Sequence, residues 1–173
     1  MRLLRRGLDG LYFGCGMIAA GFLIVMLAII VAQMLARWTG FQFPGATSYA
    51  GYTMAAASFF ALAHALNRGA HIRVGLLLTV VPAWAQRWLE LWCFGIGAVA
   101  AWFLARYTMK LVWWSWKLGD VSQGQDATPL WLPQCAMAIG AIVFAIALTD
   151  HLLRIIFLGE HGIDAEIAGG GER

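Results

Sequence analysis

Charged residues are scarce in this sequence. Of its 173 residues, 12% are charged and 61% are hydrophobic. A soluble domain typically carries about twice that share of charge, so the composition excludes an ordinary soluble fold. The net charge of +3 is small and gives no indication of a nucleic-acid partner. We therefore expect an integral membrane protein.

The sequence also lacks the patterns that usually carry chemistry. Its three cysteines, Cys15, Cys93 and Cys135, lie in apolar runs without a CxxC pair, so we expect buried small side chains. We find no hydrolase, zinc-protease or P-loop motif. No apolar run has the central carboxylate expected of a stand-alone ion-coupled transporter. We expect no catalytic residue, metal or cofactor in this chain, which is not predicted to be an enzyme.

Four apolar runs are long enough to cross a bilayer, which takes roughly 20 residues. They cover about 10–36, 45–66, 88–112 and 130–158. Lipid offers no partners to open backbone groups, so these spans should be helices. The sequence predicts an all-α protein, with residues 1–173 forming a single four-helix transmembrane domain. The first run exceeds the roughly 7–15 residues of a signal-peptide core, so we expect it to be retained.

Small-residue patterns within two of these runs favour contact between helices. One pattern is Gly10-x-x-x-Gly14, and the other is Ala136-x-x-x-Gly140. Such patterns are also frequent by chance in runs rich in glycine and alanine.

Lysine and arginine are unevenly distributed between the two sides of the predicted spans. The side with both termini receives eight: Arg2, Arg5, Arg6, Arg68, Arg73, Arg87, Arg154 and Arg173. The opposite side receives four: Arg37, Arg106, Lys110 and Lys117. Cytoplasmic loops carry the excess of positive charge. We therefore expect both termini and the loop at about 67–87 to be cytoplasmic.

Aromatic side chains flank the predicted spans at both ends. Trp84, Trp88 and Trp92 recur every four residues and share one helix face beside Arg87. They predict an interfacial amphipathic segment between helices two and three that contacts lipid or a partner, although core packing is the alternative for a single tryptophan. The second outer loop is expected to form an aromatic belt around a solvated turn, with Trp113, Trp114, Trp116, Asp120, Asp126 and Trp131 as its candidate contact residues.

A few ionisable residues lie near the ends of the spans. Asp150 and Arg154 are four residues apart and are expected to pair on one helix face. His64, His71 and His151 leave open a second class of function, because histidine is an axial haem ligand. The alternative is therefore a membrane-anchor or haem-binding electron-transfer subunit of a respiratory enzyme. A third reading, an autonomous small exporter, is disfavoured by the missing central carboxylate.

Two segments carry a more specific pattern. The run Asn67-Arg68-Gly69-Ala70-His71-Ile72-Arg73-Val74 follows the second apolar run, and Thr128-Pro129-Leu130-Trp131-Leu132-Pro133 precedes the fourth. Together they resemble the DctQ-like small membrane subunit of tripartite ATP-independent periplasmic (TRAP) transporters. The chain departs from many relatives at Thr47, Ser48 and Tyr49, and at Gly75, where acidic residues are common.

The resemblance implies a small accessory permease subunit of a sodium-coupled, binding-protein-dependent secondary transporter that imports organic acids. In this family a large multi-span permease forms the elevator-type pathway and binds sodium, and a periplasmic substrate-binding protein delivers the solute. The small subunit is expected to anchor and stabilise the scaffold of the large one in the bacterial inner membrane.

Two contact regions follow as expectations. We expect Arg68, His71 and Arg73 to set the cytoplasmic loop against lipid phosphates or the partner. The alternative for these residues is an ordinary positively charged loop. The outer loop is expected to touch the binding protein, with a solvated turn as its alternative.

Overall fold

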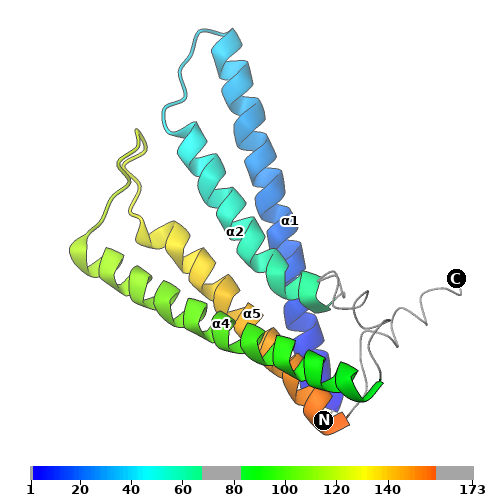
Figure 1. Ribbon diagram of the computed structural model, residues 1–173. Helices are drawn as coiled ribbons and strands as arrows, with labels where there is room; N and C mark the ends of the chain where they lie inside the picture. Colours follow the sequence, from blue (N-terminus) through cyan, green and yellow to red (C-terminus); the bar gives the residue numbers. More distant parts are fainter. Residues whose placement is uncertain (1, 68–82, 159–173) are drawn as a thin grey trace, which may run out of the picture.

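The computed structural model describes the backbone of residues 2–67 and 83–158, and the side chains of residues 7–66, 88–89 and 91–156. This part of the chain forms four α-helices (Figure 1): α1 (Arg2–Trp38), α2 (Ala46–Asn67), α4 (Ala83–Leu118) and α5 (Trp131–Leu158). Within these residues the only β-type pairing is one isolated bridge, between Val121 and Pro129. The predicted all-α class is confirmed. Most of the interfacial segment predicted at about 67–87 lies outside the described residues.

Within the described residues, three stretches are apolar and long enough to cross a membrane, which is typical of a membrane protein. They are Gly7–Trp38, Leu91–Leu118 and Trp131–Ile156, within α1, α4 and α5. Helix α2 is not among them because it carries several hydroxyl-bearing residues and His64. Its 22 residues nevertheless give a length of about 33 Å at 1.5 Å per residue.

Helix α2 satisfies several of its polar side chains internally. The hydroxyl of Thr53 donates to the carbonyl of Ala50 at 2.9 Å, and the hydroxyl of Ser58 donates to the carbonyl of Met54 at 2.9 Å. Such bonds to the preceding turn are the usual way in which serine and threonine are accommodated within a helix.

Left-handed glycines end α1 and α4. Gly119 has a φ of 66°, and the N–H of Asp120 donates to the carbonyl of Ser115 at 3.0 Å. At the end of α1, Gly40 has a φ of 75°, and Phe41 donates in the same way to the carbonyl of Ala36 at 2.9 Å. Both ends match the Schellman pattern, in which a residue with positive φ lets the chain turn back onto the last carbonyls.

Helix α4 therefore extends beyond the predicted end at about residue 112. The expectation that Trp113, Trp114 and Trp116 lie in the outer loop is wrong, because all three lie in the last turns of α4. No proline or glycine lies between residue 112 and Gly119, so nothing ends the helix at the predicted position.

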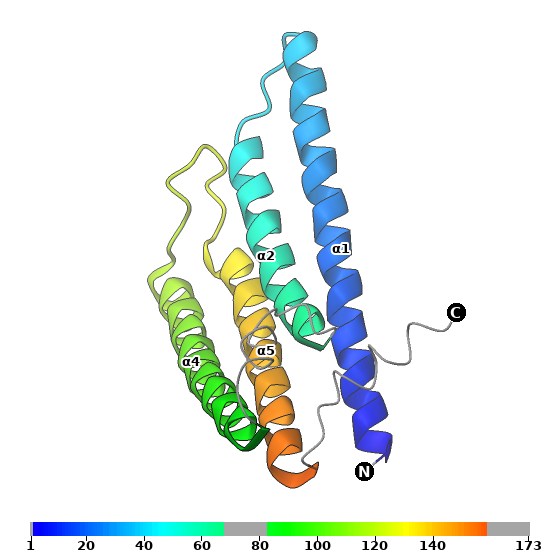
Figure 2. The same ribbon diagram turned by 45° about the vertical axis from the view of Figure 1, so that its right-hand side comes forward.

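The helices pack in a row rather than as a closed bundle. Helix α1 packs on α2, α2 on α5 and α5 on α4, so that α1 and α4 lie at the two ends of the row (Figures 1 and 2). Large exposed apolar side chains are numerous on these two edge helices, for example Ile24 (69% exposed) and Val99 (73% exposed). On α2, Met54 is the only described side chain of this kind.

Alanine dominates the buried positions between the helices. The buried alanines of the three contacts are Ala19, Ala56, Ala57, Ala63, Ala98, Ala101, Ala105, Ala138, Ala141, Ala145 and Ala147. Small side chains let helix backbones approach closely, which is how helices associate in lipid.

Helices α5 and α2 approach each other closely at Gly140 of α5. A Cβ added there would lie 2.7 Å from Cβ and 2.8 Å from the carbonyl carbon of Phe59 in α2. The helix contact expected for the pattern that ends at Gly140 is confirmed. Gly10 and Gly14 have no atom within 4 Å of an added Cβ, so these two glycines make no close helix contact within the described part of the chain.

We predict that Gly140→Ala destabilises the protein by roughly 1–3 kcal/mol, because the added methyl group overlaps the backbone of Phe59 and must push α5 away from α2. Thermal unfolding of the purified protein in detergent measures the effect. Gly21→Ala is the matched control, since nothing lies within 4 Å of a Cβ at Gly21. Equal melting temperatures for the two variants would contradict the close contact.

Candidate interaction surfaces

The loop between α4 and α5, residues 119–130, folds back on itself and reaches the start of α2 (Figures 1 and 2). The N–H of Ser122 donates to the carbonyl of Thr128 at 2.8 Å, and the N–H of Leu130 donates to the carbonyl of Asp120 at 3.0 Å. These backbone hydrogen bonds fix the shape of the loop.

Asp126 joins this loop to α2. Its Oδ2 accepts a hydrogen bond from the hydroxyl of Tyr52 at 3.1 Å, and its Oδ1 accepts one from the hydroxyl of Ser122 at 3.0 Å. The hydroxyls of Thr128 and Tyr49 form a second link between loop and helix, 3.3 Å long. We call these five residues the outer latch.

The backbone around the outer latch is tightly packed. A Cβ added to Gly124 would lie 2.5 Å from Oδ1 of Asp126, and one added to Gly45 would lie 2.8 Å from Cβ of Asp126. Gly45 has a φ of 80°, and Ala127 has a φ of 45°, a region that residues with a side chain rarely adopt. The hydrogen bonds of the outer latch therefore hold the loop in a conformation with little room for adjustment.

The charge of Asp126 is stabilised by the hydroxyls around it. Burial opposes its ionisation, but hydrogen bonds from Thr128, its own backbone N–H, Ser122 and Tyr52 outweigh burial and lower the pKa of Asp126 from 3.8 to about 2. Asp126 is therefore a carboxylate at neutral pH, which is the form that accepts these hydrogen bonds.

Histidines connect neighbouring helices at the helix ends that lie away from the outer latch. Nδ1 of His64 lies 3.2 Å from the carbonyl oxygen of Tyr12, which links α2 to α1. The His64 ring also lies against Gly16, where an added Cβ would be 2.8 Å from the ring. His151 of α5 is buried and stacks on Phe94 of α4, with ring centroids 6.0 Å apart. Both histidines thus take part in contacts between helices.

An ion pair lies beside His151. Arg154 pairs with Asp150 at 2.5 Å along α5, which confirms the pairing expected from their spacing. The hydroxyl of Tyr12 and Nε2 of His151 are buried and form no hydrogen bond within the described part of the chain. No group of three metal-ligating side chains occurs among the described residues.

Tryptophans cover the last turns of α4. Trp113 and Trp114 meet edge to face, with ring centroids 5.1 Å apart. Nζ of Lys117 lies 4.8 Å and 5.6 Å from their ring centroids, within the range of a cation–π interaction. Trp116 is 66% exposed. This pairing of exposed rings with a lysine is typical of a membrane–water interface.

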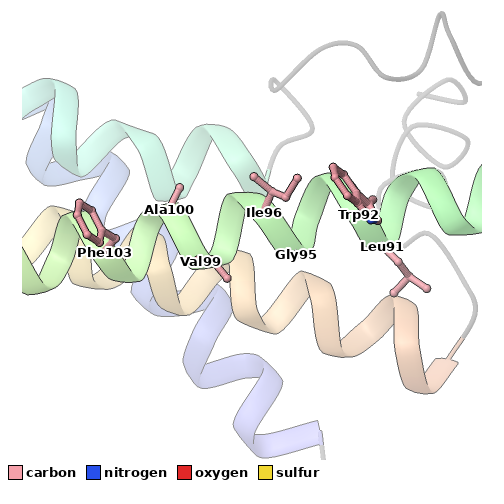
Figure 3. A pocket seen from close by; sticks show the side chains of 7 residues that line it. All are labelled: Leu91, Trp92, Gly95, Ile96, Val99, Ala100 and Phe103. Atoms are coloured by element: carbon pink, nitrogen blue, oxygen red, sulfur yellow. The ribbon is translucent and has the colours of Figure 1, made fainter.

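The surface of α4 also contains an apolar hollow in its first half (Figure 3). Its lining comes entirely from α4: Leu91, Trp92, Gly95, Ile96, Val99, Ala100 and Phe103. Gly95 has nothing within 4 Å of an added Cβ, so the missing side chain leaves a depression next to Trp92. The hollow has the apolar character that suits a lipid chain or the side of another helix.

Comparison with known families identifies the chain. The model for "Tripartite ATP-independent periplasmic transporters, DctQ component" matches residues 26–158, from the second half of α1 to the end of α5. The chain belongs to this family. It is therefore the small subunit of a TRAP transporter, a transport component and not an enzyme. Comparison with curated proteins found no match.

The expected resemblance is thereby confirmed, and the match gives no support to the respiratory-enzyme alternative. The predicted cytoplasmic contact residues Arg68, His71 and Arg73 lie outside the described residues. Trp84 and Arg87 lie on α4, but their side chains are outside the described part.

The structure describes the positions of the other predicted contact residues of the TRAP small subunit. Trp88 and Trp92 are both 70% exposed on α4, where they are available to lipid or a partner. Asp120 is exposed, Trp131 begins α5 and is half-buried, and Asp126 belongs to the outer latch. Their proposed roles in contacts with other proteins stay predictions.

The sequence prediction missed Tyr49 and Tyr52. The available signal was the presence of two tyrosines at the start of the second apolar run, on the side of the membrane where the sequence also places an acidic loop. The cysteines were only partly predicted: Cys15 is buried and Cys135 is half-buried, but Cys93 is exposed. The expectation for Cys93 is wrong because α4 is an edge helix with one uncovered face.

We predict that the stabilising effect of ionised Asp126 persists to acidic pH. Because the folded-state pKa is depressed, the contribution is complete above the ordinary value of 3.8 and is lost as the pH falls towards about 2. The difference in melting temperature between the wild type and Asp126→Asn, measured in detergent, should be constant from about pH 8 to 5 and shrink below about pH 4. A difference that disappears near pH 6 would contradict this assignment.

Proposed function

We propose that this TRAP small subunit anchors and stabilises the stationary scaffold of a large elevator-type permease. The observation that carries the proposal is the open row of helices, because both edge helices leave apolar faces uncovered by the rest of the described chain. A fixed scaffold within a moving transporter needs such lateral contacts with lipid and with a neighbouring subunit.

All four helices cross the membrane in this proposal. Helix α2 is the least apolar, but it packs between α1 and α5 and therefore needs less lipid-facing surface than they do. The excess of lysine and arginine at the terminal side supports a location of both termini in the cytoplasm, with the subunit in the bacterial inner membrane. The outer latch then lies on the periplasmic side.

Transport itself is assigned to the partners. The large permease would couple sodium to the import of an organic acid, which a periplasmic binding protein delivers. No carboxylate stands in the middle of the apolar spans of this chain, so its own residues do not supply the ion site that coupling needs. The small subunit needs no cofactor for this role.

Extraction of the tagged protein from its native membrane in mild detergent tests the proposal. We expect a larger multi-span permease to co-purify in a fixed ratio, identified by mass spectrometry. A haem-bearing enzyme as the partner, recognised by its visible absorption spectrum, would overturn the proposal, as would purification of the chain alone.

The cytoplasmic loop offers a second test. We predict that His71→Ala lowers the yield of the complex several-fold, because a histidine between two arginines serves a specific contact rather than general charge. Thr79→Ala is the matched control, since it truncates another polar side chain of the same loop to which no contact is assigned, and it should leave the yield near that of the wild type. Unchanged yield and uptake in His71→Ala would contradict the specific contact and leave the segment as an ordinary positively charged loop.

A further inference from the structure

We propose that the outer latch positions the loop between α4 and α5 as a preformed docking element for the periplasmic binding protein. The inference rests on the proposed function, which places this loop outside the membrane. It adds a specific contact, the hydrogen bond from Tyr52 to Asp126, that determines where the loop lies.

The loop is held at its sides and open at its tip. Side chains of the outer latch are half-buried where the loop meets α2, whereas Gln123 and Gln125 at the tip are exposed. The N–H of Gly124, between the two glutamines, donates to the hydroxyl of Ser122 at 3.2 Å. The tip therefore presents two amide side chains from a backbone that is fixed from within the loop.

The chemistry of the tip favours a soluble protein rather than lipid. Exposed amides and irregular backbone need polar partners, which the hydrocarbon region of a membrane does not offer. At the base of the same loop, where Val121 is bridged to Pro129, lie the exposed side chains of Asp120 and Val121, the latter 54% exposed. A small surface that mixes amide, acidic and apolar groups suits a reversible protein contact.

Preorganisation gives the latch its effect on binding. A loop already held in its docking conformation does not lose further conformational freedom when the partner binds, and this raises affinity. Release of the latch should therefore weaken docking without weakening the helix contacts α1–α2, α2–α5 and α4–α5, which lie between the helices themselves.

The test uses the complex of the small and large subunits in lipid nanodiscs, with the fluorescently labelled binding protein of the same transporter as the probe. We expect Tyr52→Phe and Asp126→Ala to raise the dissociation constant about three- to tenfold, while the yield of the complex is unchanged. Asp126→Asn should bind more tightly than Asp126→Ala, because the amide oxygen of asparagine still accepts a hydrogen bond although the charge is lost.

Tyr107→Phe is the matched control, because it removes a hydroxyl from an exposed tyrosine on α4, away from the loop. We expect its dissociation constant to equal that of the wild type. If Asp126→Asn binds as weakly as Asp126→Ala, the charge rather than the position of the loop controls docking, and the inference fails.

A direct measurement of loop order separates the possible failures. A nitroxide on Gln123→Cys, with the native cysteines replaced by serine, should become more mobile when Tyr52→Phe is added. An unchanged spectrum would overturn the role of the latch, and a mobile loop with unchanged affinity would overturn docking through this loop. Loss of the large subunit from the wild-type preparation would instead overturn the proposed function.

Discussion

Gly140 of α5 lies against the backbone of Phe59 in α2, and this contact joins the two halves of the molecule. One half consists of α1 packed on α2, and the other consists of α4 packed on α5. Without a hydrophobic effect to drive helices together in lipid, close packing of small residues is the main source of association. The rest of the arrangement depends on this approach of α2 to α5.

A row of helices has different requirements at its centre and at its edges. Helix α2 is covered on two sides, so it tolerates hydroxyl-bearing side chains that a lipid-facing helix would rarely carry. Helices α1 and α4 present long apolar faces, and α4 adds exposed tryptophans at 88, 92, 113, 114 and 116. The polarity of each helix thus follows from its place in the row.

Side-chain interactions reinforce the row at both ends of its helices. At one end, Tyr52 and Asp126 tie the loop after α4 to the start of α2. At the other, His64 reaches the backbone of Tyr12, and His151 stacks on Phe94. These contacts link helices that are distant in sequence, whereas the ion pair of Asp150 with Arg154 lies within one helix.

The sequence by itself determined the features that depend on local pattern. Apolar run length predicts the helices, the spacing of Asp150 and Arg154 predicts their ion pair, and the segments around His71 and Pro129 indicate the family. It misplaced the end of α4, because a run of tryptophans reads equally well as a belt or as helix until the left-handed Gly119 is seen.

Only the tertiary structure decided which surfaces meet. The exposure of Cys93 follows from the edge position of α4, and the role of Gly140 follows from the neighbour that it faces. Asp126 reads as a solvated loop residue in the sequence, yet it is held by a tyrosine 74 positions earlier. No local pattern encodes such a pairing, because its geometry is set by how α2 and α5 pack and not by either segment alone.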